Sequence, residues 1–216
     1  MAMLGIETAH GWGEIMKRVV RVLRQILLSA ALACLGGCAT FYVDGNSPEV
    51  PVAQYKKPVA PGDVQLIWEF QTKGVANARA TAMLKARVRD QIVDSGLFAS
   101  VSDAPVASGA LLAATVNNVP LSDDAVSKGF LAGLTFGIAG QTVGDGYECT
   151  LRYTPGRSGA APLERNGKHV IYTSVGSGGP PPGAQKMTNV DEAVTTMLRQ
   201  LISRTLNDLS QDPAFP

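Results

Sequence analysis

Histidine and cysteine are scarce in this chain of 216 residues, which has two histidines and three cysteines. Only His169 and Cys149 lie outside the N-terminal forty residues. One histidine without a second histidine or a paired cysteine does not make a zinc site. The acidic residues Asp123, Asp124 and Asp145 lack the spacing of an EF-hand, so we expect them in solvated turns. The sequence therefore predicts no bound metal.

Catalytic motifs are also missing. The chain has no Gly-x-Ser-x-Gly nucleophile elbow, and its glycine-rich stretch 176–183 lacks the Lys and Ser/Thr of a phosphate-binding loop. We expect His169 to be a satisfied or surface side chain and Cys149 to be a small buried hydrophobe. A hydrolase or redox enzyme that uses either residue is the less favoured alternative. We therefore predict a non-enzymatic protein without a cofactor.

Charge is sparse and evenly spread. Charged residues make up 17% of the chain and the formal net charge is +1, with no block of like charges. This pattern does not favour a nucleic-acid partner. Apolar runs are short as well, because none reaches the ~20 residues that a helix needs to cross a bilayer.

The most apolar run, 26–35, follows a basic stretch. No acidic residue lies between Lys17 and Leu35, and the run ends in small residues. A basic stretch, a short apolar segment and a small-residue end are typical of a secretory signal peptide, which we assign to residues 1–37. The stretch 1–15 contains two glutamates and is unlike a signal peptide, so we expect the true start at Met16. The basic residues are Lys17, Arg18, Arg21 and Arg24.

The tetrad Leu35-Gly36-Gly37-Cys38 resembles the lipobox of bacterial lipoproteins. The resemblance implies cleavage before Cys38, a diacylglycerol on its sulfur and an acyl chain on its new amine. Two or three such chains make a durable membrane anchor. By resemblance to the enterobacterial sorting rule, Ala39 in the next position implies the periplasmic face of the outer membrane. With Cys38 acylated, Cys149 has no partner for a disulfide.

A proline-rich segment follows the lipobox. Prolines recur through residues 38–62, which we predict to be the lipidated N-terminus and an extended tether. Phe41 and Tyr42 lie directly behind Cys38, where they either settle at the lipid headgroups or simply begin this tether. The prolines are Pro48, Pro51, Pro58 and Pro61.

Periodicity predicts one folded domain over residues 63–211, which the lipobox resemblance would place in the periplasm. Apolar residues alternate in some segments, which predicts strands, and recur every three to four residues in two others, which predicts helices. Asn189 followed by Glu192 is close to a capping box for the second helix. We predict an α+β fold, a two-layer sandwich of a mostly antiparallel sheet of four to five strands with two helices packed on one face. The strands are expected at 64–70, 98–101, 110–119, 147–153 and 169–174, and the helices at 76–95 and 190–209.

This order of elements behind a lipobox resembles small outer-membrane lipoproteins, including the lipoprotein that plugs the lipopolysaccharide-export barrel. The resemblance is architectural, covers residues 64–209 and includes no shared motif. Ala39-Thr40-Phe41 replaces the glycine-and-aromatic pattern that this family has behind its lipidated cysteine. The resemblance implies a domain that binds an envelope assembly or transport partner.

A glycine-rich insert, residues 127–146, interrupts the domain. Its glycines recur every four residues between apolar side chains, as in a glycine zipper that lets another backbone approach closely. Such a zipper would make the chain a membrane-active or oligomerising lipoprotein, which is our alternative function. An apolar loop that folds over the sheet, with glycines at its turns, is the simpler interpretation, and the oligomeric state stays open. The patch would comprise Gly129, Phe130, Gly133, Phe136 and Gly137.

Overall fold

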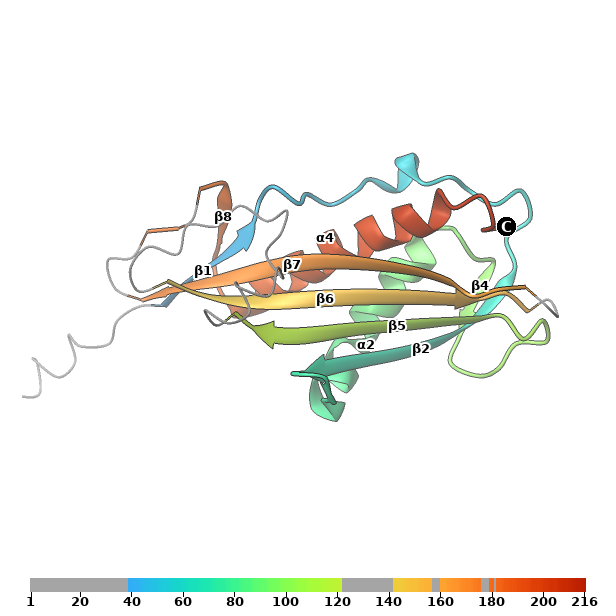
Figure 1. The fold of residues 1–216 in the computed structure, drawn as a ribbon, viewed down its shortest axis with the longest axis horizontal. Helices are drawn as coiled ribbons and strands as arrows, with labels where there is room; N and C mark the ends of the chain where they lie inside the picture. The colour runs from blue at the N-terminus through green and yellow to red at the C-terminus, as the bar shows by residue number, and fades with distance from the viewer. Residues whose placement is uncertain (1–38, 122–141, 157–159, 176–178, 181) are drawn as a thin grey trace, which may run out of the picture. The chain divides into compact units, whose positions relative to one another are not determined.

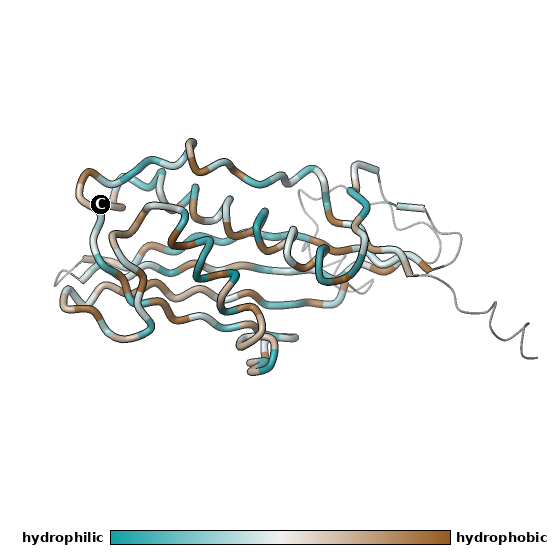
Figure 2. Tube along the Cα trace, turned by 180° about the vertical axis from the view of Figure 1, so that it is seen from behind, coloured by the Kyte–Doolittle hydropathy of each residue, from teal (hydrophilic) through white to brown (hydrophobic). Residues whose placement is uncertain are grey.

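The computed structural model describes residues 39–121, 142–156, 160–175, 179–180 and 182–216, which form one unit of eight strands and two α-helices (Figure 1). The predicted signal peptide and lipobox lie outside the described residues. Both helices cover the same face of the sheet, so the predicted two-layer α+β arrangement is confirmed. Apolar and polar residues alternate along the long strands (Figure 2).

The first helix, α2 (Ala78–Asp94), matches its predicted position closely. The side chain of Asn77 caps it by accepting a hydrogen bond from the amide of Ala80 at 3.0 Å. Leu84, Val88 and Ile92 recur every four residues and form its buried face. The helix ends close to the predicted residue 95, and the next residue, Gly96, has a φ of 62°, a conformation that glycine adopts without strain.

The second helix, α4 (Val190–Ser210), begins at the predicted cap. Asn189 Oδ1 accepts the amide of Glu192 at 2.9 Å, and the Glu192 carboxylate accepts the amide of Thr188 at 2.6 Å. The acidic first turn also suits the positive end of the helix dipole. The helix buries a broad face, since the sheet lies against one side of it and the N-terminal segment of the domain against another.

The sheet is larger than predicted and is mixed. Its strand order is β3-β2-β5-β6-β7-β1-β8, and the short strand β4 also pairs with β2. β2 runs parallel to β4 and β5 because α2 carries the chain back between them, and the other pairs are antiparallel. The strands are β1 (Ala39–Asp44), β2 (Asp63–Thr72), β3 (Val75–Ala76), β4 (Ser100–Ser102), β5 (Leu111–Pro120), β6 (Thr142–Thr154), β7 (Leu163–Val175) and β8 (Ala184–Met187).

Residues 39–62 are not the extended tether that we predicted. β1 pairs with both β7 and β8, so residues 39–44 are part of the sheet. The strap, which we define as residues 45–62, then runs along α4 (Figure 1). The side chains of Ser203 and Ser210 accept its backbone amides from Val50 at 3.0 Å and from Lys56 at 3.1 Å. These two hydrogen bonds hold the strap against the helix.

The main core lies between the sheet and the helices. Gly167 on β7 faces α4 so closely that a Cβ there would lie 2.7 Å from Thr205 Oγ1 and 2.9 Å from Leu201 Cδ1. Its strand partner is Cys149, another small residue. This pair lets the helix approach the sheet. Gly167 lies inside β7, which begins at Leu163 and is therefore longer than the strand that we predicted at 169–174.

Candidate functional site

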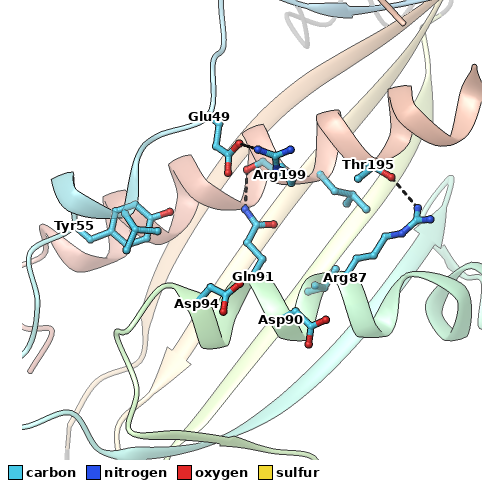
Figure 3. Close-up of a pocket in the computed structure, with 11 residues that line it drawn as sticks. Glu49, Tyr55, Arg87, Asp90, Gln91, Asp94, Thr195 and Arg199 are labelled. Carbon is cyan, nitrogen blue, oxygen red and sulfur yellow. Dashed lines mark hydrogen bonds and ion pairs between the residues drawn. The ribbon is translucent and has the colours of Figure 1, made fainter. Parts of the chain in front are cut away.

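A cavity of about 380 Å³ opens between the two helices and the strap (Figure 3). Its floor is apolar, because Val88 of α2 and Leu198 of α4 are 0% and 2% exposed. Its polar lining comes from all three segments. α2 contributes residues that recur every three to four positions and so share one side of the helix. The polar lining residues are Glu49, Tyr55, Arg87, Asp90, Gln91, Asp94, Thr195 and Arg199.

Polar contacts across the cavity join the segments that form it. Glu49 of the strap pairs with Arg199 of α4, and Gln91 of α2 donates to the carbonyl of Arg199 at 2.8 Å. Arg87 of α2 donates to Thr195 Oγ1 at 2.9 Å and also pairs with Asp191 at 2.9 Å (Figure 3). Both arginines of the cavity are therefore already paired.

Asp90 and Asp94 are the carboxylates that stay available. They lie one helical turn apart on α2, both are exposed, and neither has a hydrogen-bond or ion-pair partner in the described part of the chain (Figure 3). With an apolar floor below them, they make an arrangement that suits a basic side chain with an aliphatic stem. The residues that line the cavity include no histidine, cysteine or serine.

Tyr55 secures the strap at one end of this cavity. Its hydroxyl donates to the carbonyl of Ser203 at 3.0 Å, and only 6% of the residue is exposed. Burial, and then the negative charge of Glu49, raises the pKa of its phenol to about 12. Tyr55 therefore stays neutral at physiological pH and acts as a structural contact. The sequence did not predict the cavity, because the strap that forms its third wall was taken for a tether.

His169 is buried and both of its ring nitrogens are satisfied, as predicted. The residue is 1% exposed, Nε2 lies 2.7 Å from Gln200 Oε1, and Nδ1 accepts the amide of Val170 at 2.8 Å. This pattern places the proton on Nε2. Burial lowers the pKa of the imidazole, although the contact with Gln200 opposes the shift. The ring thus stabilises the packing of β7 against α4.

Asp44 at the end of β1 is a buried carboxylate that the sequence did not single out. It is 3% exposed, and its Oδ1 accepts the backbone amide of Asn46 at 3.1 Å and the side-chain amide at 3.0 Å. Its Oδ2 has no hydrogen-bond partner in the described residues. The charge of Asp44 acts on the buried His169 and on Tyr172, whose pKa burial raises to about 12.

Cys149 is a buried free thiol, as predicted. It is 1% exposed, and burial raises its pKa to about 12. A thiol that stays protonated is a poor nucleophile. Cys149 therefore fills space next to Gly167 and is not suited to redox chemistry.

The other predicted sites lie wholly or partly outside the described residues. Leu35, Gly36, Gly37 and Cys38 precede them, and the patch from Gly129 to Gly137 falls in the gap between residues 121 and 142. The last five residues of the predicted insert instead belong to strand β6. Asp145 is among them and lies opposite Ile171 in the sheet, which corrects its predicted place in a turn. Asp123 and Asp124 lie in the same gap.

The described residues contain no candidate for a membrane helix or a metal centre. Within them, neither helix is long and apolar enough to cross a bilayer. The same residues contain no group of three or more histidine, cysteine, aspartate or glutamate side chains placed to hold a metal ion.

Comparison with known proteins gives similar structures but no family. No family model matches the chain, and no curated protein matches it. Among solved structures, the PelC dodecamer from Paraburkholderia phytofirmans is 13% identical, with a TM-score of 0.32 over 79% of this chain and 96% of that one. Protein XCC0632 from Xanthomonas campestris, of the DUF330 family, is 16% identical, with a TM-score of 0.31 over 71% and 85%. A "putative lipoprotein" from Caulobacter crescentus CB15 is 12% identical, with a TM-score of 0.26 over 68% and 87%. At these values the similarity supports no assignment of family, partner or assembly.

Proposed function

We propose that this chain is a non-enzymatic lipoprotein of the bacterial envelope, anchored through acyl chains on Cys38, whose domain binds a protein partner on its helical face. The lipobox tetrad supports the anchor. The cavity between α2, α4 and the strap is the observation that carries the partner site, because it combines an apolar floor with the carboxylates of Asp90 and Asp94, which have no partner among the described residues. Such a site fits a basic side chain of an envelope protein.

The anchor is tested by mass spectrometry and by fractionation. The mature protein should begin at Cys38 and carry the mass of a diacylglycerol and an N-acyl chain, and Cys38→Ser should appear in the soluble fraction. A bare cysteine, or a retained leader, would contradict the anchor. Ala39 is exposed, so Ala39→Asp should leave the fold intact and, under the sorting rule, move the protein to the inner membrane.

The partner site is tested with photocrosslinking residues in intact cells. A crosslinker in place of Val52, which lines the cavity and is 41% exposed, should trap one envelope protein. The matched control is Ile67, which is 50% exposed on the opposite face of the sheet. Asp94→Lys should weaken the crosslink from position 52, because it places a cation where a basic partner group would bind. Equal crosslinking from both positions would argue against the cavity.

A further inference from the structure

The first residues of β1 and β6 and the last residues of β7 lie side by side at one end of the sheet, next to the proposed lipid. Ala39 lies opposite Val175, and Ser174 lies between Thr40 on one side and Thr142 on the other. One peptide bond joins Ala39 to Cys38. Because β1 begins at Ala39, an acyl chain on Cys38 would be attached directly to this end of the sheet, with no linker residues between them.

The residues at this end of the three strands carry no charge. We define the sheet end as residues 39–42, 142–144 and 172–175 of these three strands, which contain no acidic or basic side chain. The first charges beyond it are Asp44 and Asp145. Lys186 of β8 lies opposite Tyr42 at the border of this region. Farther along the same sheet, charged pairs such as Lys168 with Glu148 appear.

Two exposed valines lie on the same face of the sheet end. Val143 is 61% exposed and Val175 is 42% exposed. Val143 lies opposite Thr173, two residues before Val175, so the valines are diagonal neighbours with side chains on one face. Phe41 of β1, which is half-buried, lies opposite the same Thr173, on the strand that flanks β7 on its other side. Two exposed apolar side chains therefore lie side by side where the chain would meet lipid.

We propose that the sheet end inserts into the headgroup region of the leaflet that holds the Cys38 lipid, with Val143 and Val175 in contact with the acyl boundary. The inference rests on the lipid anchor of the proposed function. The four outermost residues of a strand cover about 10 Å, at a rise of ~3.4 Å per residue. That length matches the ~5–10 Å to which interfacial protein segments enter a leaflet. The domain would then stand with its strands pointing out of the membrane surface.

The test uses spin labels on the full lipidated protein, bound to vesicles of phosphatidylethanolamine and phosphatidylglycerol. A nitroxide is placed at Val143→Cys, at Val175→Cys and, as the control, at Val59→Cys. Val59 is fully exposed and precedes β2, whose first residue lies at the opposite end of the sheet. Native Cys149 is buried and does not compete for the label. Power saturation then compares access of oxygen, which concentrates in lipid, with access of a water-soluble nickel chelate.

The proposal expects an oxygen-to-nickel accessibility ratio several-fold higher at positions 143 and 175 than at position 59. Equal ratios at all three positions, with Cys38 shown by mass spectrometry to be lipidated, would overturn the inference and leave the anchor intact. A bare Cys38 would overturn both. Circular dichroism identifies any variant that has not folded. In that case Val143→Trp and Val175→Trp replace the cysteine variants, and quenching of their tryptophan fluorescence by brominated lipid tests the same contact.

Discussion

At the residue scale, the close approach of α4 to the sheet depends on the missing side chain at Gly167. We expect Gly167→Ala to lower the free energy of unfolding by about 1–3 kcal/mol, because the added methyl group must displace Thr205 and Leu201 from a packed core. Urea unfolding followed by circular dichroism measures the change. Gly62→Ala is the matched control, since a Cβ at Gly62 meets nothing within 4 Å and should change stability by less than ~0.5 kcal/mol. Equal effects from the two substitutions would mean that the helix can shift to admit the methyl group.

His169 gives the fold a pH dependence whose sign follows from its lowered pKa. In the unfolded chain the imidazole titrates near its ordinary pKa of ~6.5, whereas in the folded chain burial holds the pKa lower. As the pH falls below ~6.5, the unfolded state therefore takes up the proton first. The stability that this residue contributes is complete above ~6.5 and is lost as the pH approaches the folded pKa.

The free energy of unfolding, measured by urea titration at pH 7.5 and at about pH 5, tests this. His169→Gln should reduce the difference between the two values, because glutamine does not titrate while the carboxylates that do are unchanged. An unaltered difference in this variant would assign the pH dependence to groups other than His169.

At the element scale, the N-terminus of α4 depends on one side chain. Asn189→Ala removes the acceptor for the amide of Glu192 and should cost about 1 kcal/mol of stability. Asn189→Ser is the control, since serine also caps helices well and should stay close to the native value. Thermal or urea unfolding compares the two variants. A loss of equal size in both would show that the amide of Asn189, and not capping as such, is needed.

Elements with strong internal patterns could be predicted from sequence, and elements set by their neighbours could not. The spacing of four residues between Leu84, Val88 and Ile92 predicts α2, and the cap at Asn189 predicts the start of α4. β3 and β8 have two and four residues, too few for a periodic pattern. β7 begins at Leu163 because β6 supplies backbone partners for a stretch whose Asn166-Gly167 is typical of a loop.

At the scale of the whole molecule, the region that looked like a tether proves to be part of the domain. Four prolines and a pair of lysines favour an extended, independent segment, and no local pattern reveals that buried hydroxyls on a helix about 150 residues later accept its amides. The cavity has the same origin, because its strap wall comes from this segment and its other walls come from both helices. Contacts between segments so distant in sequence depend on the tertiary fold, which local sequence patterns do not reveal.

The strap contact can be tested one amide at a time by hydrogen exchange. Ser203→Ala removes the hydroxyl that accepts the amide of Val50, so the protection of that amide should fall roughly five-fold for a loss of ~1 kcal/mol. The amide of Lys56 is held by Ser210 and serves as the internal control in the same sample. If the strap is bound along its length, only Val50 and its immediate neighbours lose protection. If Lys56 exchanges faster as well, the strap detaches as a unit, and the cavity that it walls should then open and close with it.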